Sequence, residues 1–198
     1  MKSCARLQCW QKAVSCRDFD TNEAHSLGGV VTGPATPHRD VSDSTSYTDF
    51  LLRSVRDAGA DRVGVTSAAP LTRAKAALEA RVAAGFADDM QFTFRNPDRS
   101  TTPTMSVPGA RSIIVAARSY WSDGQHDAAT GDRIDARVAR YAWRDHYEPL
   151  RDALRVAARR LKRDGHRATV FADDNSVVDR EVAWRAGLGW YGKNANLL

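Results

Sequence analysis

The fold is decided by residues 168–198, whose sequence is ATVFADDNSVVDREVAWRAGLGWYGKNANLL. Residues 168–172 predict a strand, and residues 176–186 predict a helix that ends at Gly187. A strand followed at once by a helix is typical of domains in which helices are layered on a sheet. We therefore expect a layered α/β fold.

The same alternation of helices and strands continues upstream. Apolar residues at helical spacing predict helices over residues 47–58, 70–84 and 147–162. Shorter apolar or alternating runs predict strands over residues 61–66 and 112–117, the second being the strongest strand signal in the chain. These elements predict one domain at residues 46–198.

Residues 1–45 have a different character. They combine Gly, Pro, Ser, Asp and Thr with little periodicity, which predicts a disordered extension outside the fold. The chain's three cysteines, Cys4, Cys9 and Cys16, all lie there. Their spacing does not match the usual ligand runs of zinc or iron–sulfur sites, so we interpret them as incidental thiols and expect no metal ligands in this chain.

The composition indicates a soluble globular protein. Of 198 residues, 42% are hydrophobic and 27% charged, and the mean hydropathy is −0.48. No apolar run approaches the ~20 residues that span a bilayer, and no secretory signal is visible, so we expect a cytoplasmic protein. The net charge of +5 favours polyanionic partners such as RNA. An arginine-rich composition inherited from a GC-rich genome explains the charge equally well.

The segment Asp173-Asp174-Asn175-Ser176 lies where the predicted strand meets the predicted helix. In layered α/β domains such junctions line the crevice in which ligands bind. The alternative is a structural role, because a carboxylate there can cap the helix. Since Ser176 or Asn175 can already provide that cap, at least one aspartate is left for chemistry.

The segment 185–194, RAGLGWYGKN, places three glycines just before Lys193. Glycines allow positive φ and a close approach of the backbone to a ligand. The spacing is not that of a phosphate-binding P-loop, and the glycines follow a helix rather than a strand, which excludes a dinucleotide-binding fingerprint. A glycine cap with a tight turn is the structural alternative, and both interpretations can hold together.

These segments resemble a known family, the epoxyqueuosine reductases. Asp173, residues 177–180 and the turn at 185–194 are similar to that family's Asp-led strand end, short helix and AGLGW-x-GK turn. Upstream segments are similar to other family elements: RNPDR at 95–99, PGARS at 108–112, and RYA with RDHY within 140–147. The ordered matches cover about residues 47–198.

The resemblance implies a cobalamin-dependent reductase that removes the epoxide oxygen of epoxyqueuosine in a tRNA anticodon, the last step of queuosine formation. It also implies a nitroreductase- or cobalamin-processing-like α/β half that forms one wall of the cobalamin pocket. In the family, a ferredoxin-like domain with two 4Fe-4S clusters and tRNA-binding repeats completes the enzyme. The partners implied are tRNA and an external electron donor, with no membrane, and we expect a monomer.

The resemblance also implies roles for single residues. Asp173 matches the proton donor, which we expect to be buried and therefore protonated. Asp145 and Arg180 match positions that orient the substrate, although a helix-surface ion pair explains Arg180 equally well. The residues matching the cofactor-facing positions are Tyr141, Gly187, Gly189, Trp190, Lys193 and Asn194.

The sequence departs from the family pattern in three places. The common Asp-Tyr-His order appears as Asp145-His146-Tyr147, and residues 174–176 replace a Thr-Gly/Ala-Pro run. The cysteine runs that hold the clusters are absent. We therefore expect a C-terminally truncated chain that is inactive alone.

Two other hypotheses remain. One is another corrinoid-binding reductase or carrier, which would share the fold but not the RNP and AGLGW-x-GK elements together. The other is a non-catalytic RNA-binding module. Its aromatic residues, Trp121, Trp143 and Trp190, are too scattered to mark a base-stacking platform.

Overall fold

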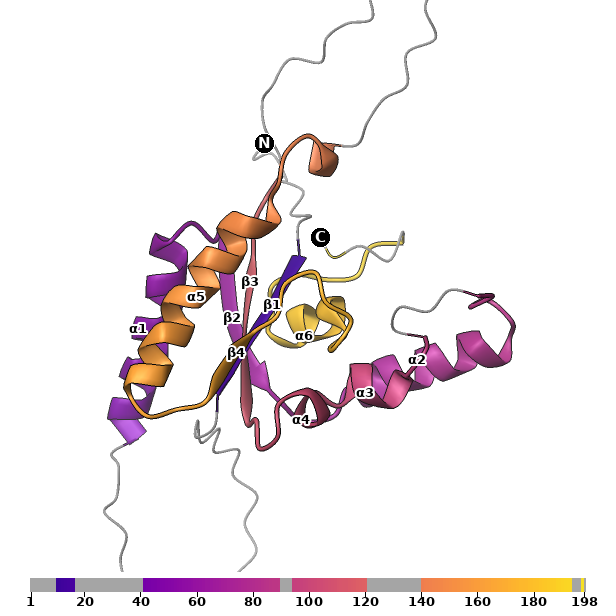
Figure 1. Ribbon diagram of the computed structural model, residues 1–198, viewed down its shortest axis with the longest axis horizontal. Coiled ribbons are helices and arrows are strands. Elements are labelled where there is room, and N and C mark those ends of the chain that lie inside the picture. The colour runs from indigo at the N-terminus through magenta and orange to yellow at the C-terminus, as the bar shows by residue number, and fades with distance from the viewer. Residues whose placement is uncertain (1–9, 17–40, 90–93, 121–139, 194–196, 198) are drawn as a thin grey trace, which may run out of the picture.

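The structure is a computed structural model that describes residues 10–16, 41–89, 94–120, 140–193 and 197 (Figure 1). At its centre is a four-stranded sheet in the order β2-β3-β1-β4, and each neighbouring pair is antiparallel. The strands are β1 (Trp10–Cys16), β2 (Arg62–Ser67), β3 (Ser112–Ala117) and β4 (Ala168–Val170).

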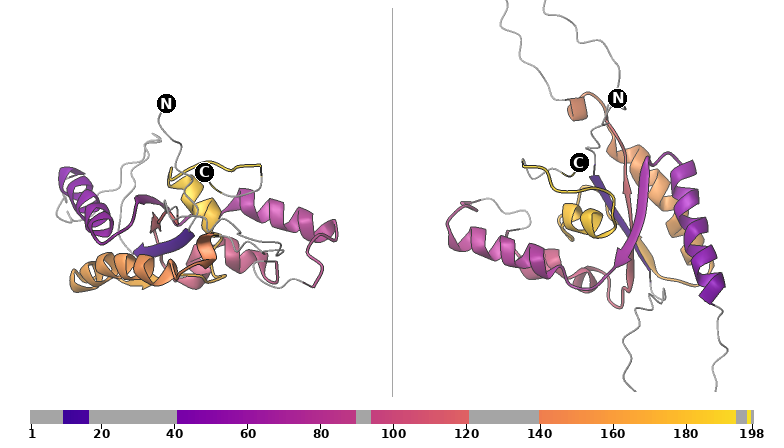
Figure 2. Two further views of the ribbon diagram at one scale, coloured as in Figure 1. Left: turned by 90° about the horizontal axis from the view of Figure 1, so that it is seen from above. Right: turned by 180° about the vertical axis from the view of Figure 1, so that it is seen from behind.

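Helices lie on both faces of this sheet, which confirms the layered α/β fold (Figures 1 and 2). One face is covered by α1 (Val41–Asp57) and α5 (Tyr147–Arg163), and the other by α6 (Asp179–Arg185). Three further helices flank α6 on its side: α2 (Thr72–Ala83), α3 (Pro97–Thr101) and α4 (Pro103–Ser106). A 3-10 helix, η1 (Arg140–Ala142), precedes α5.

Strand β3 joins the two halves of the core. All six of its residues are buried, as expected for a continuous apolar run. Ile114 and Ala116 pack with the residues of α1 and α5, whereas Ile113 and Val115 pack with the residues around α6. This alternation follows from the two-residue period of a strand.

Helix α5 is amphipathic, as its sequence predicts. Leu150, Leu154 and Leu161 are fully buried against the sheet, because they recur at helical spacing along one face. Three of its arginines, Arg151, Arg155 and Arg160, pair with nearby carboxylates, Arg155 with Asp152 at 2.7 Å. None of the helices in the described ranges has the length and apolar character needed to cross a bilayer.

The structure corrects the expected extension at residues 1–45 in two places. Trp10–Cys16 form β1, which pairs with both β3 and β4, and α1 begins at Val41. A strand in this position supplies the backbone hydrogen bonds that the facing edges of β3 and β4 require. Such pairing depends on strands distant in sequence, so the local composition does not reveal it.

Candidate functional site

The loop between β4 and α6, residues 171–178, carries the predicted proton donor. Asp173 has φ +52°, in the left-handed region that only a few residues other than glycine adopt. Aspartate and asparagine are among those residues. The Asp173 side chain is exposed and makes no hydrogen bond or ion pair to any residue that the structure describes. The expectation of a buried carboxyl is therefore wrong for this chain.

The residues after Asp173 are tied to the neighbouring helices. The Ser176 amide donates to Asp174 Oδ1 at 2.6 Å, and the Val178 amide donates to the Ser100 carbonyl at 2.9 Å. The Ser106 hydroxyl donates to the Ser176 carbonyl at 3.1 Å. These bonds engage residues 176–178 outside any helix, so α6 begins at Asp179 rather than at the predicted Ser176.

The same bonds correct the expected capping. Asp174, rather than Ser176 or Asn175, supplies the side-chain acceptor, and it closes a local turn instead of capping α6. Of the two aspartates, Asp173 is the one without a hydrogen bond or ion pair to the described residues, and its loop is anchored through Ser176 and Val178.

A cleft of about 510 Å³ lies beside this loop and the first turn of α6. Its walls come from α2, from Phe94, and from the loop and first turn of α6 that include Asp174, Val178 and Arg180. Arg180 is exposed at this cleft, a few residues from Asp173. The structure thus brings Arg180 to the same surface as the loop, as a substrate-orienting side chain requires.

The cleft is also lined by an ion pair that the sequence did not predict, in which one partner is buried and the other half exposed. The Arg73 guanidinium of α2 donates to both carboxylate oxygens of Glu181, at 3.1 and 2.6 Å, and the Tyr191 hydroxyl donates to Glu181 at 3.0 Å. The Glu181 side chain is only 4% exposed. Arg73 also lies 4.0 Å from the ring centroid of Trp184. Burial, followed by the nearby Glu181, raises the pKa of Tyr191 to about 12, so this hydroxyl stays a donor.

Replacing Arg73 by alanine is expected to lower the free energy of unfolding by about 2–3 kcal/mol, because Glu181 would keep a buried charge with only Tyr191 beside it. The value is below that for a fully buried pair because Arg73 is itself half exposed. Urea unfolding followed by circular dichroism measures it. Arg155→Ala, at an exposed ion pair on α5, is the control and should leave the midpoint unchanged. The double variant Arg73→Met with Glu181→Leu should recover most of the loss, and a loss as large as that of Arg73→Ala would contradict the argument.

The glycine turn follows α6 directly. Gly187 has φ +71° and ends the helix, while the Leu188 amide donates to the Ala183 carbonyl at 3.0 Å. The turn packs on β2, because a Cβ at Gly64 would lie 2.6 Å from both the Ala186 carbonyl oxygen and Leu188 Cδ1. Both interpretations of the glycines therefore remain compatible: the turn is a cap, and it presents the following residues at the surface.

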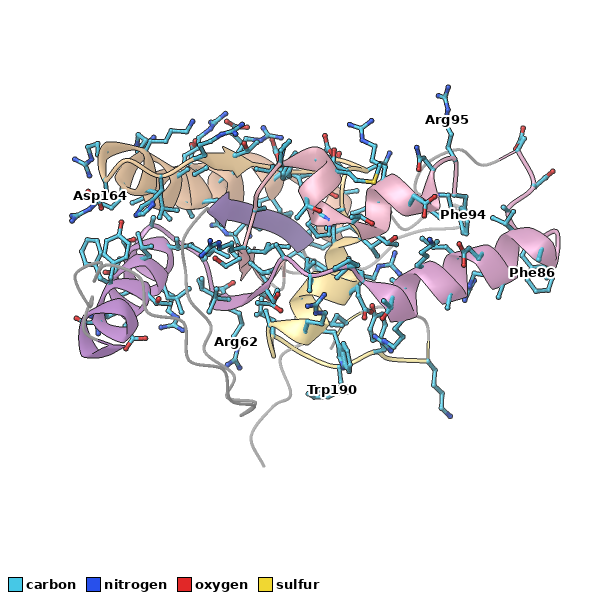
Figure 3. The ribbon with its side chains drawn as sticks, turned by 90° about the horizontal axis from the view of Figure 1, so that it is seen from below. Arg62, Phe86, Phe94, Arg95, Asp164 and Trp190 are labelled. Atoms are coloured by element: carbon cyan, nitrogen blue, oxygen red, sulfur yellow. The ribbon has the colours of Figure 1, made fainter. Side chains whose placement is uncertain are left out.

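Those following residues expose an aromatic ring and a cation. Trp190 is 59% exposed and projects from the surface beside α6 (Figure 3). Lys193 is exposed as well, and Tyr191 forms an isolated bridge with Leu197. Gly189 lies between Leu188 and Trp190 in the same turn. Asn194, the last of the predicted cofactor residues, lies outside the described residues.

The structure also gives Asp145 a structural contact. Its Oδ1 accepts hydrogen bonds from the amides of Tyr147 and Glu148, at 2.7 and 3.2 Å, which caps α5. Tyr141 is 60% exposed, and its ring centroid lies 6.3 Å from that of Tyr120. Helix α5 runs back along β4, so its first turn lies towards the same end of the sheet as the loop after β4 (Figure 1). No contact joins Tyr141 or Asp145 to the Asp173 loop among the residues described.

His146 is a buried titratable residue next to this cap. It is 4% exposed, and its Nε2 has no hydrogen-bond partner within the described segments. Its ring centroid lies 6.2 Å from that of Tyr120. Desolvation, with smaller effects from Arg144 and Arg118, lowers the pKa of His146 below its ordinary 6.5.

The protein is therefore expected to lose stability on mild acidification. An imidazole whose folded-state pKa lies below the unfolded value adds stability above pH 6.5, and that stability falls as the pH drops through the folded-state pKa. His146→Gln should flatten the dependence of the unfolding free energy on pH between about 7 and 5, because glutamine does not titrate. His166→Gln, at a less buried histidine after α5, is the control. An equal slope for wild type and His146→Gln would contradict the prediction.

Known proteins match this chain over most of its length. A family model described as "Epoxyqueuosine reductase QueG, DUF1730" matches residues 101–174. Epoxyqueuosine reductase from Gloeobacter violaceus is 36% identical over 72% of this chain and 44% of its own length. The enzyme from Xanthomonas campestris is 32% identical over 79% of this chain and 45% of its own. The chain thus spans about half the length of the curated relatives it matches.

Solved structures agree with the sequence matches. A crystal structure of epoxyqueuosine reductase with an epoxyqueuosine-modified tRNA-Tyr stem loop superposes with a TM-score of 0.67 at 27% identity, over 76% of this chain and 40% of that one. A structure of the Bacillus subtilis enzyme gives a TM-score of 0.62 at 25% identity over the same shares. Sequence and fold together show that this chain is a homologue of the epoxyqueuosine reductases across about half of their length.

Proposed function

We propose that this chain forms the Asp173-bearing part of an enzyme that reduces epoxyqueuosine to queuosine in tRNA. The observation that carries the proposal is the loop at residues 171–178, in which Asp173 follows a strand, is exposed and has no partner among the described residues, while the next residues are fixed by hydrogen bonds. The solved Bacillus subtilis relative is described with its aspartate-bearing catalytic loop swung out of the active site. An aspartate exposed on the loop that joins β4 to α6 suits that role.

The chemistry assigned to Asp173 is proton donation. Removing an epoxide oxygen as water consumes two electrons and two protons and leaves a carbon–carbon double bond. Negative charge develops on the oxygen as its bond to carbon breaks, so a carboxylic acid within hydrogen-bond reach lowers the barrier. Within the described residues the Asp173 carboxyl takes no part in the loop's own hydrogen bonds. Arg180 and Asp145 are assigned to orienting the substrate, with Asp145 using the carboxylate oxygen that does not cap α5.

The exposed side chains after α6 fit a large, flat and partly apolar cofactor. Trp190 and Tyr141 each leave more than half of their area uncovered, and a Cβ at Gly187 would meet nothing within 4 Å. Gly187, Gly189, Trp190, Lys193, Asn194 and Tyr141 are the residues we assign to one wall of a cobalamin site. When bound, cobalamin would supply reducing equivalents at its cobalt.

Iron–sulfur clusters do not fit the residues of this chain. Its three cysteines, Cys4, Cys9 and Cys16, cannot provide the four thiolates that a cluster requires. Within the described ranges, no three His, Cys, Asp or Glu side chains gather as a metal site would require. Reducing electrons must therefore come from a donor outside the residues present here, and the tRNA bearing the epoxide is the proposed second partner.

Cobalamin retention tests the proposal. The chain, and a version extended by the remaining length of its relatives, are mixed with hydroxocobalamin and passed over gel filtration while the corrin absorbance is recorded. We expect the protein peak to carry corrin, and Trp190→Ala to reduce that amount several-fold. Phe50→Ala, at an exposed aromatic ring on α1 across the sheet, is the matched control. An extended protein that retains no corrin would overturn the cofactor assignment.

A further inference from the structure

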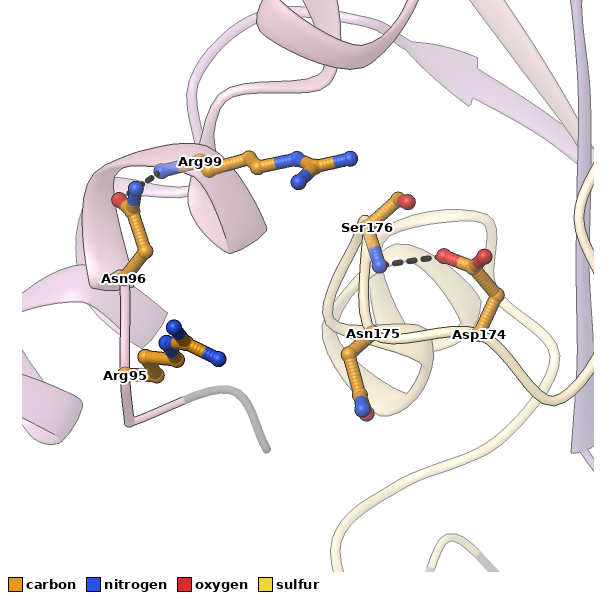
Figure 4. Close-up of a pocket in the computed structure, with 6 residues that line it drawn as sticks. All are labelled: Arg95, Asn96, Arg99, Asp174, Asn175 and Ser176. Atoms are coloured by element: carbon orange, nitrogen blue, oxygen red, sulfur yellow. Dashed lines mark hydrogen bonds between the residues drawn. The ribbon is translucent and has the colours of Figure 1, made fainter. Parts of the chain in front are cut away.

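A second, polar pocket adjoins the Asp173 loop and shares Asp174 and Asn175 with the cleft. It has a volume of about 640 Å³. One wall is formed by Arg95, Asn96 and Arg99, and the facing wall by Asp174, Asn175 and Ser176 (Figure 4). The first wall is the RNPDR segment, to which the sequence assigns no role. Residues some eighty positions apart therefore meet at one cavity beside the candidate proton donor.

The arginine wall stands on a fixed element. Asn96 Oδ1 accepts from the Arg99 amide at 3.0 Å and so caps α3, whose first residue is Pro97. The Thr101 hydroxyl donates to the Pro97 carbonyl at 2.6 Å, and the Leu71 amide donates to the Thr101 carbonyl at 2.7 Å. Because Ser100 and Thr101 are buried, this short helix cannot turn freely, and the backbone from which the Arg99 side chain extends is fixed.

The charges of the pocket are unbalanced. In Figure 4 the Arg99 guanidinium extends across the cavity towards the 174–176 wall. It makes no hydrogen bond or ion pair within the part of the chain that the structure describes, whereas Arg73, Arg155 and Arg160 each pair with a carboxylate. Asp174 is the one carboxylate among the lining residues, and its Oδ1 is engaged by the Ser176 amide at 2.6 Å. The Arg99 guanidinium therefore brings to this cavity a positive charge that no carboxylate in the described residues pairs with.

We infer that this pocket binds a phosphate group of the ligand that reaches Asp173. A guanidinium presents parallel N–H donors that match two oxygens of a phosphate, and the Arg99 guanidinium extends into the cavity (Figure 4). The Asn175 side chain on the facing wall adds neutral hydrogen-bonding capacity. The inference rests on the proposed function, in which both partners carry a phosphodiester: the RNA backbone and the nucleotide loop of cobalamin.

The test compares Arg99→Gln with Arg159→Gln. Arg159 is exposed on α5, across the sheet from the pocket, so both variants lose one positive charge. Three probes are titrated into the full chain. Binding of inorganic phosphate is detected by NMR through the arginine Nε–H resonances. Hydroxocobalamin is compared with cobinamide, which lacks the phosphodiester, and an anticodon stem-loop RNA is titrated at several salt concentrations. Thermal melts of both variants verify that they are folded.

Inorganic phosphate is expected to shift the Arg99 Nε–H resonance in wild type and not the Arg159 resonance. If the cofactor supplies the phosphate, Arg99→Gln weakens hydroxocobalamin binding about tenfold and leaves cobinamide binding unchanged. If the RNA supplies it, Arg99→Gln lowers the slope of log affinity against log salt by about 1 relative to Arg159→Gln.

The inference is overturned if phosphate leaves Arg99 unperturbed and Arg99→Gln binds every probe as Arg159→Gln does. That outcome differs from a failure of the proposed function, in which the wild-type chain and its extended form bind neither cobalamin nor RNA. The phosphate titration decides the inference in either case, because it needs no cofactor or RNA.

Discussion

Replacing Asp173 by asparagine is expected to slow epoxide reduction by about 10²- to 10⁴-fold in the protein that carries this chain with its cofactor, the range lost when a general acid is removed. Asparagine keeps the size of the side chain and cannot donate a carboxylic proton. It also tolerates the left-handed φ of +52°, so the loop should keep its backbone. Conversion of epoxyqueuosine in tRNA, measured by nucleoside mass spectrometry in single-turnover reactions, reports the rate.

Two comparisons separate proton donation from folding. Asp152→Asn, at an exposed ion pair of α5 with Arg155, removes an equal charge far from the loop and should react at the wild-type rate. Asp173→Ala adds backbone strain of about 1 kcal/mol to the loss of the carboxyl, so its melting temperature should fall below that of Asp173→Asn. Asp173→Asn turning over at the wild-type rate would remove this residue from the reaction.

The parts of the fold that follow from local patterns were predictable. The run SIIVAA at residues 112–117 is apolar after Ser112 because both of its faces are covered, and it forms β3 with the predicted bounds. The spacing of the leucines in residues 147–162 predicted the bounds of α5 to within one residue. Leucines that recur at helical spacing lie on one face of a helix, and that face is the one that becomes buried. Gly187 ends α6 as predicted.

The parts that depend on distant partners were not predictable. Residues 10–16 form strand β1 by pairing with β3 on one side and β4 on the other. The hydrogen bond from the Val178 amide to the Ser100 carbonyl holds Val178 outside the helix, so α6 begins later than predicted. The Arg73–Glu181 pair joins residues 108 positions apart, and Glu181 alone is expected on a helix surface. One signal was present in the sequence: Glu181 lies between Val177 and Val182, on the apolar side of a short helix, where a charge requires a partner.

The sequence predicted which residues belong to the candidate site better than it predicted how exposed those residues are. The resemblance selected Asp173 and Arg180, and the structure places both at one loop and its adjoining helix turn. The exposure of Asp173 could not be read from the sequence, since the residues that cover a loop come from elsewhere in a fold. The pocket lined by Arg95 and Arg99 could not be predicted for the same reason. It forms only because the fold brings the RNPDR segment opposite residues 174–176.

Replacing Gly64 by alanine is expected to displace the glycine turn and destabilise the fold by about 1–3 kcal/mol, the usual cost of overpacking. The added Cβ would lie 2.6 Å from the Ala186 carbonyl oxygen and 2.6 Å from Leu188 Cδ1, and the carbonyl belongs to the backbone that ends α6. Since Trp190 and Lys193 follow that backbone, the variant should also retain less cobalamin. Chemical unfolding and corrin retention on gel filtration measure the two effects.

A double-mutant cycle with Leu188→Ala separates the two clashes. Truncating Leu188 removes Cδ1 but leaves the Ala186 carbonyl, so Gly64→Ala should cost less in the Leu188→Ala background, with a coupling of about 0.5–1.5 kcal/mol. The cost that remains reports the approach of β2 to the turn's backbone, which no side-chain change relieves. If Gly64→Ala unfolds at the wild-type denaturant concentration and retains as much corrin, then the turn does not depend on β2 for its position. The close packing of the edge strand β2 against the segment bearing Trp190 would then be irrelevant to the site.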